Sequence, residues 1–112
     1  MTPAELRRTA HLVDPACWAE DVLGWHPHSF QARLLRSPRG SRWHVKVARL
    51  HGKTESAAAL LAHTAVFWPG STSVVIAPTQ RQAAEAVRRC RRMLLKAGVV
   101  LAVDNPYSIE VQ

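Results

Sequence analysis

The chain has 112 residues, a length that allows one domain with a modest core. Its composition, 47% hydrophobic and 21% charged, is ordinary for a globular protein and excludes wholesale disorder. The formal net charge of +7 predicts a polyanion as partner, although a basic run on a helix is equally typical of a plain solvated face.

Two short helices are predicted in the first forty residues. The first spans residues 15–23, because Asp14 is a good N-cap, Pro15 suits the first helical position and Gly24 can end the helix. The second spans residues 30–35 and precedes a proline- and glycine-containing turn. These helices lead into the sheet that we expect further along the chain.

A strand, a loop, a helix and a second strand are predicted next. Apolar and polar side chains alternate over residues 43–47, the period expected of a strand. The tripeptide Gly52-Lys53-Thr54 follows, and a long apolar helix is expected over residues 55–67. The continuous apolar run at 74–77 is typical of a strand that is buried in a parallel sheet.

The strongest periodic pattern lies between Thr79, a candidate N-cap, and Gly98. Its apolar positions follow helical spacing: Ala83, Ala86, Val87, Cys90, Met93, Leu94 and Ala97. Most of the positive charge lies in the same helix, at Arg81, Arg88, Arg89, Arg91, Arg92 and Lys96. Strands at 99–103 and 107–111 are expected to follow, separated by a turn. Strands that alternate with helices predict an α/β domain with a parallel sheet and right-handed crossovers.

No membrane-directing segment and no site built from cysteine or histidine is predicted. The longest apolar stretch, at 57–68, is shorter than the roughly 20 residues that span a bilayer, and the N-terminus does not resemble a signal peptide. Cys17 and Cys90 have no second cysteine nearby, so we expect both to be small buried hydrophobic residues. The closest histidines, His26 and His28, lack a cysteine or carboxylate in register. A cytoplasmic location follows.

The tripeptide Gly52-Lys53-Thr54 indicates a phosphate-binding loop between a strand and a helix. The glycine lets backbone N–H groups close around phosphate oxygens, and the start of the helix adds its positive dipole end. Lys53 would reach the β- and γ-phosphates, and the Thr54 hydroxyl would bind Mg²⁺. The match is partial, since Val47 stands where the first glycine is usual.

Residues 14 to 96 resemble the N-terminal ATPase segment of a phage or prophage terminase large subunit, the motor that packages viral DNA into procapsids. The run 14–25 is similar to the lead-in helix of that family, and Phe30-Gln31 to its adenine-reading element. Residues 48–54 resemble its variant phosphate loop, which commonly lacks the first glycine. Residues 75–83 resemble a strand and helix start that the family shares with helicases.

The resemblance implies a partial P-loop NTPase (RecA-like) domain, with a helical lead-in at 1–40 and an incomplete ATPase core at 41–112. It implies ATP and Mg²⁺ as cofactors, with Arg49 stabilising charge on the γ-phosphate. The implied partners are double-stranded DNA, portal protein and the small terminase subunit, in the cytoplasm of a bacterial host. Ala48 and Leu50 depart from the usual serine and glutamine, which puts the supporting hydrogen bonds of the loop in doubt.

A carboxylate-bearing strand ending in Asp-Glu, which such ATPases need to hold magnesium, is absent from the sequence. Asp104 follows an apolar run, but Asn105 stands where the glutamate is required, and a loop residue near a turn is the simpler interpretation. We therefore expect a fragment with little or no ATP hydrolysis. Two other interpretations stay open: the first lobe of a superfamily 2 DNA helicase, and a non-enzymatic basic prophage remnant with a vestigial loop.

Overall fold

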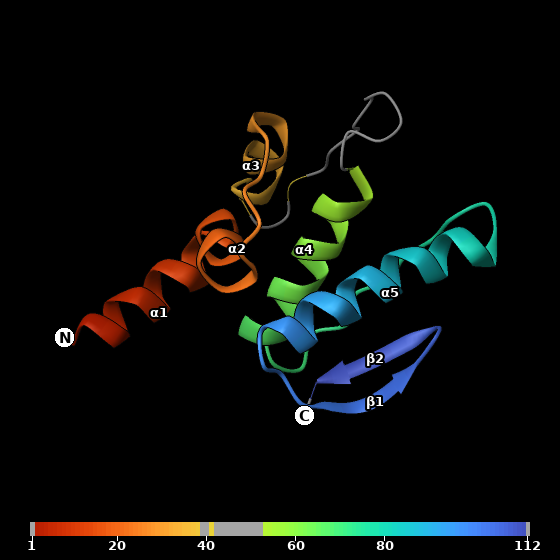
Figure 1. Ribbon diagram of the computed structural model, residues 1–112. Helices are drawn as coiled ribbons and strands as arrows, with labels where there is room; N and C mark the ends of the chain where they lie inside the picture. The colour runs from red at the N-terminus through yellow and green to blue at the C-terminus, as the bar shows by residue number, and fades with distance from the viewer. Residues whose placement is uncertain (1, 39–40, 42–52, 112) are drawn as a thin grey trace.

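The computed structural model describes residues 2–38, 41 and 53–111, which form helices and one small hairpin (Figure 1). Helix α4 crosses α5 and contacts α2 and α3, α1 projects from one side, and the hairpin lies beside α5. The elements are α1 (Pro3–Val13), α2 (Pro15–Leu23), α3 (Ser29–Leu35), α4 (Lys53–Phe67), α5 (Gln80–Lys96), β1 (Leu101–Asn105) and β2 (Ser108–Val111).

Helix α1 is an element that the sequence analysis did not predict. It begins with a capping box, in which the Glu5 backbone N–H donates to Thr2 Oγ1 at 3.1 Å and the Thr2 N–H donates to Glu5 Oε2 at 3.4 Å. Pro3 occupies the first helical position. Threonine, proline and a glutamate three residues after the cap form a recognised helix-start pattern, so the signal was present in the sequence.

The two short predicted helices are confirmed as α2 and α3. Asp14 caps α2 as expected, accepting hydrogen bonds from the N–H groups of Ala16 and Cys17. Gly24 ends the helix in the left-handed conformation, with a φ of 65° that glycine adopts without strain. Helix α3 begins one residue before the predicted start. These ends are set by local side-chain chemistry, which is why the sequence predicts them.

The core lies where α4 meets α2, α3 and α5. Helix α4 presents fully buried alanines, which let the other helices approach its backbone closely. Helix α5 contributes the predicted apolar face, and its buried residues are Ala86, Cys90, Met93 and Leu94. Thr79 caps α5 by accepting from the Gln82 N–H at 3.2 Å, and Gly98 follows the helix with a φ of 79°. The predicted helices at 55–67 and after Thr79 are therefore confirmed.

The predicted parallel sheet is wrong, and with it the RecA-like fold class. The described residues form mostly helix, and their one sheet is an antiparallel pair in which Leu101 lies opposite Val111 and Asn105 opposite Ser108. Residues 74–77 form no strand: Val74 is 74% exposed and Ile76 is 91% exposed. The predicted strand at 43–47 lies outside the described residues.

The hairpin forms because its turn is stabilised locally. Asn105 Oδ1 accepts hydrogen bonds from the N–H groups of Tyr107 and Ser108, both at 2.9 Å, which closes the chain directly after β1. Closing so short a loop costs less entropy than pairing strands that lie far apart in the sequence. A short apolar run such as 74–77 has no such local partner, and its composition does not distinguish a buried strand from an extended segment.

Among the helices of the described ranges, none combines the length and the apolar character that spanning a bilayer requires.

Candidate functional site

Helix α4 begins at Lys53, directly after the glycine of the predicted phosphate loop. Thr54 lies in the first turn of this helix and is exposed. Arg49 and Gly52, predicted to contact the phosphates, lie outside the described residues. Of the predicted phosphate and magnesium ligands, Lys53 and Thr54 therefore stand at the N-terminus of a 15-residue helix, where the backbone N–H groups and the dipole favour an anion.

The predicted adenine-reading residues, Phe30 and Gln31, lie in the first turn of α3, a helix that packs against α4. Gln31 is only 2% exposed, and its Oε1 accepts a hydrogen bond of 2.7 Å from the His28 backbone N–H. Phe30 is half-buried. The Gln31 carboxamide thus caps its own helix, while the adenine-reading role stays a prediction.

A carboxylate–guanidinium–carboxylate group joins the first turn of α4 to α5. Arg89 donates to Glu55 Oε2 at 2.7 Å and to Glu85 Oε1 at 2.9 Å. The hydrogen bond from Arg89 lowers the pKa of the Glu85 carboxyl. The pKa of the Arg89 guanidinium is raised, first by its hydrogen bond to Glu85 and then by its hydrogen bond to Glu55. Arg89 therefore connects the two helices, and two carboxylates balance its charge.

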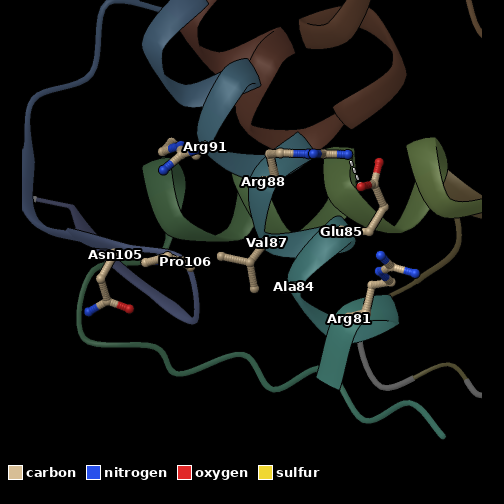
Figure 2. A pocket seen from close by; sticks show the side chains of 8 residues that line it. All are labelled: Arg81, Ala84, Glu85, Val87, Arg88, Arg91, Asn105 and Pro106. Atoms are coloured by element: carbon tan, nitrogen blue, oxygen red, sulfur yellow. Dashed lines mark hydrogen bonds and ion pairs between the residues drawn. The ribbon is translucent and has the colours of Figure 1, made fainter. Parts of the chain in front are cut away.

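A surface hollow of about 350 Å³ lies between α5 and the turn of the hairpin (Figure 2). Figure 2 shows three arginines of α5 around it, with the small side chains of Ala84 and Val87 between them and the turn residues on the other side. Its lining residues are Arg81, Ala84, Glu85, Val87, Arg88, Arg91, Asn105 and Pro106. An arginine-lined hollow with an apolar floor suits an organic molecule that carries a phosphate or another anionic group. The arginines would bind the anionic group, and the floor would contact the rest of the molecule.

The arginines of this hollow are not equally available. Arg88 is bonded to Glu85, and Arg91 Nη1 donates to Asp104 Oδ1 at 3.3 Å. Arg81 is exposed and, within the described part of the chain, has no ion pair. Arg81 is therefore the strongest candidate for a direct anion contact. Asp104, predicted to be a loop residue, lies in β1 and neutralises part of the charge on Arg91.

A second cluster joins α1 to α2 and was not predicted. One potential ligand atom each from His11, Cys17 and Asp21 lies within 4.8 Å of the others. Cys17 and Asp21 lie four residues apart on a predicted helix, so the sequence alone was sufficient to place them on one helix face. His11 could not be found in the same way, because helix α1, which presents it, was not predicted.

The two cysteines differ in their surroundings. Cys90 is buried as predicted, and burial raises the pKa of its thiol to about 11. Cys17 is only half-buried, so the prediction that both are buried is wrong for this residue. Desolvation, followed by the negative charge of Asp21, raises the pKa of the Cys17 thiol. Both thiols are therefore poor nucleophiles near neutral pH.

No family model, curated protein or solved structure matches this chain.

Proposed function

We propose that this chain is the nucleotide-binding part of a terminase-type DNA-packaging ATPase, a protein of the bacterial host cytoplasm that binds ATP and Mg²⁺. The observation that carries the proposal is the start of α4 at Lys53, which puts the Gly-Lys-Thr tripeptide at a helix N-terminus. Phosphate-binding loops need this position, because the N–H groups and the dipole of the helix then point at the phosphates. Portal protein and the small terminase subunit are the partners that this function requires.

The roles within the site follow from the chemistry of each residue. Lys53 and Arg49 neutralise the β- and γ-phosphates, Gly52 lets the backbone approach them, and Thr54 binds Mg²⁺ through its hydroxyl. Phe30, which is half-buried, contacts the adenine, and Gln31, whose buried carboxamide accepts from the His28 N–H, holds the helix turn that carries it. The packing of α3 against α4 brings this turn's helix beside the phosphate-binding helix. The strand predicted before the loop, at 43–47, lies outside the described residues, so the start of α4 and the motif itself are what support this site.

The chain binds ATP without efficient turnover, because its sequence contains no Asp-Glu pair to orient the attacking water. Titration of ATP-Mg²⁺ by calorimetry tests the binding. Lys53→Ala is expected to weaken it about tenfold or more, since a hydrogen bond to a charged group contributes about 1.5–3 kcal/mol. Lys96→Ala, which removes an exposed lysine at the end of α5, is the matched control and should bind as the wild type does.

Equal affinities of the wild type and Lys53→Ala would contradict the proposed phosphate site. A steady-state assay gives the second test. Turnover that Lys53→Ala abolishes would show that the chain hydrolyses ATP and would contradict the proposed lack of efficient hydrolysis, while leaving the binding site intact.

A second candidate function is a non-enzymatic module that binds double-stranded DNA and keeps the loop only as a remnant. The arginine-lined hollow on α5 favours it. DNA phosphates would enter the hollow at Arg81, so affinity should fall steeply with salt. Each phosphate contact contributes about 0.9 to the slope of log K against log salt concentration on duplex DNA.

The binding of Arg81→Gln to a short duplex can be measured by fluorescence anisotropy at several salt concentrations. Its slope of log K against log salt concentration should be shallower than that of the wild type by about 0.9, the contribution of one phosphate contact. Arg33→Gln, which removes an exposed arginine of α3, should keep the wild-type slope. The absence of ATP binding at millimolar concentration, together with this loss of slope, would favour the module over the ATPase. A flat salt response in the wild type would contradict DNA binding in both candidates.

A further inference from the structure

We propose that His11, Cys17 and Asp21 form a binding site for a zinc-type divalent cation between α1 and α2. His11 Nε2 lies 2.9 Å from Asp21 Oδ2, and Cys17 Sγ lies 3.6 Å from the same oxygen. All three ligand atoms lie within 4.8 Å of one another. The site shares no residue with the phosphate-binding helix start or with the hollow on α5, so it is independent of the proposed function.

Two of the three distances are close to those that a tetrahedral ion needs, and the third, between His11 and Cys17, lies within 4.8 Å. Bond lengths of about 2.0 Å to nitrogen and oxygen and about 2.3 Å to sulfur place neighbouring ligand atoms roughly 3.3–3.6 Å apart. The contact between Cys17 and Asp21 already has this length, whereas the His11–Asp21 pair must open by a few tenths of an ångström. Asp21 is half-exposed, so its carboxylate can open this contact, and rotation of the partly exposed Cys17 side chain would bring its sulfur toward His11.

Cys17 and Asp21 are carried by the same helix, α2. The two residues lie one turn apart on one face of α2. The start of that helix is held by Asp14, whose Oδ1 accepts from the Cys17 N–H at 3.2 Å. The same aspartate ends α1, so a single residue separates the two helices that supply the ligands.

The position of His11 is fixed from the other side. Its carbonyl oxygen accepts a hydrogen bond of 2.7 Å from His63 Nε2, a buried contact between the end of α1 and α4. The His63 ring in turn packs against Trp18 and Phe67, with centroids 5.7 Å and 4.7 Å away. His11 is itself only 7% exposed, so its imidazole has little freedom to leave the cluster.

The donor set selects the class of ion. Imidazole nitrogen and thiolate sulfur favour Zn²⁺ over Mg²⁺ or Ca²⁺, which prefer oxygen ligands only. On binding, the Cys17 thiol releases its proton to solvent, and the proton that His11 Nε2 shares with Asp21 moves to Nδ1, so that the Nε2 lone pair faces the metal. Three protein ligands leave the fourth position to water, on the exposed side of Asp21.

Titration of the metal-free full chain with Co²⁺ tests the site, because cobalt substitutes for zinc and reports thiolate ligation by a charge-transfer band in the near ultraviolet. The band is expected in the wild type and in Cys90→Ala, and absent in Cys17→Ser. Competition with a chromogenic chelator then gives the Zn²⁺ affinity. His11→Gln and Asp21→Asn should each weaken it by at least about tenfold, the loss typical of removing even an outer-shell partner.

His26→Gln is the matched control, since His26 forms an exposed pair with Glu20 at 3.1 Å outside the cluster. It should bind Zn²⁺ as the wild type does, and Mg²⁺ should not compete. The absence of a thiolate band in the wild type, or equal Zn²⁺ affinity in the wild type and in Asp21→Asn, would overturn the proposal. Far-ultraviolet circular dichroism of each variant shows whether it keeps its helices, and Asp21→Asn, at a half-exposed position, is the variant expected to keep them all.

Discussion

Asp14 serves two helices at once, and it shows how much one side chain contributes at the residue scale. Its backbone ends α1, while its carboxylate accepts from two N–H groups in the first turn of α2. The same carboxylate accepts from Arg36 Nε at 3.1 Å, which connects it to the end of α3. The angle between α1 and α2, and with it the cluster around His11, depends on this residue.

Asp14→Ala is therefore expected to lower the free energy of unfolding by about 0.5–2 kcal/mol, the range observed when an N-cap is lost. Asp14→Asn is the matched control: asparagine caps a helix as well as aspartate does, and only the partly exposed contact with Arg36 is weakened. Urea unfolding of both variants measures the difference. Equal losses in the two variants would show that the ion pair, and not the cap, is what stabilises this corner.

At the scale of elements, Arg89 is the polar connection between α4 and α5. It lies between Glu85 of its own helix and Glu55 in the first turn of α4, with all three side chains about one-third exposed. Solvent screens such a group in part, so its contribution to stability is modest. The position of Arg89 matters more than its contribution to stability, because its contact with Glu55 orients the first turn of α4, which begins at Lys53, relative to α5.

Arg89→Met should lower the melting temperature modestly, whereas Arg92→Met, at an exposed position of the same helix, should leave it nearly unchanged.

The stabilisation by the contact between Arg89 and Glu85 should also depend on pH. The pKa of Glu85 is lowered in the folded chain, so its contribution is complete above the ordinary pKa of a glutamate and is lost as the pH falls through the folded value.

Melting curves of the wild type and Glu85→Gln should therefore differ at neutral pH and converge in acid. A difference that persists at low pH would show that the carboxylate charge is not what stabilises the contact.

At the scale of the whole molecule, α4 is the helix around which the others pack. It contacts α2, α3 and α5, and Ala58 and Ala62 on it are completely buried. Small side chains at these positions let three neighbours approach one helix, in a molecule of 46 × 33 × 25 Å. Close packing leaves little room for larger groups at the crossing points.

Ala62→Leu is expected to destabilise the fold by about 1–3 kcal/mol, because extra methylene groups in a packed interior force neighbouring side chains and backbone to shift. Ala57→Leu, on the exposed face of the same helix, should change stability by less than about 0.5 kcal/mol. Denaturant unfolding of both variants makes the comparison. Similar stabilities would mean that α4 is not tightly packed in solution.

Local chemistry is what the sequence made predictable. Asp14 and Gly24 mark the ends of α2, Thr79 marks the start of α5, and helical spacing identifies the buried face of α5. In the candidate site, the sequence predicted that a helix would follow Gly52, and it indicated the basic character of α5. Each of these features depends on residues within a turn or two of one another, where capping and periodicity act directly.

Contacts between distant residues were decided only by the tertiary structure. The run at 74–77 has the composition of a buried strand, but Val74 and Ile76 are exposed and the run pairs with no strand of the described residues. A strand exists only where a partner supplies its hydrogen bonds, and the hairpin at 101–111 finds its partner locally. Arg89 became a structural residue because Glu55 of another helix meets it. His11 reaches Cys17 and Asp21 only because the chain turns at Asp14, so that the C-terminal end of α1 meets α2, and the spacing of residues in the sequence does not contain that angle.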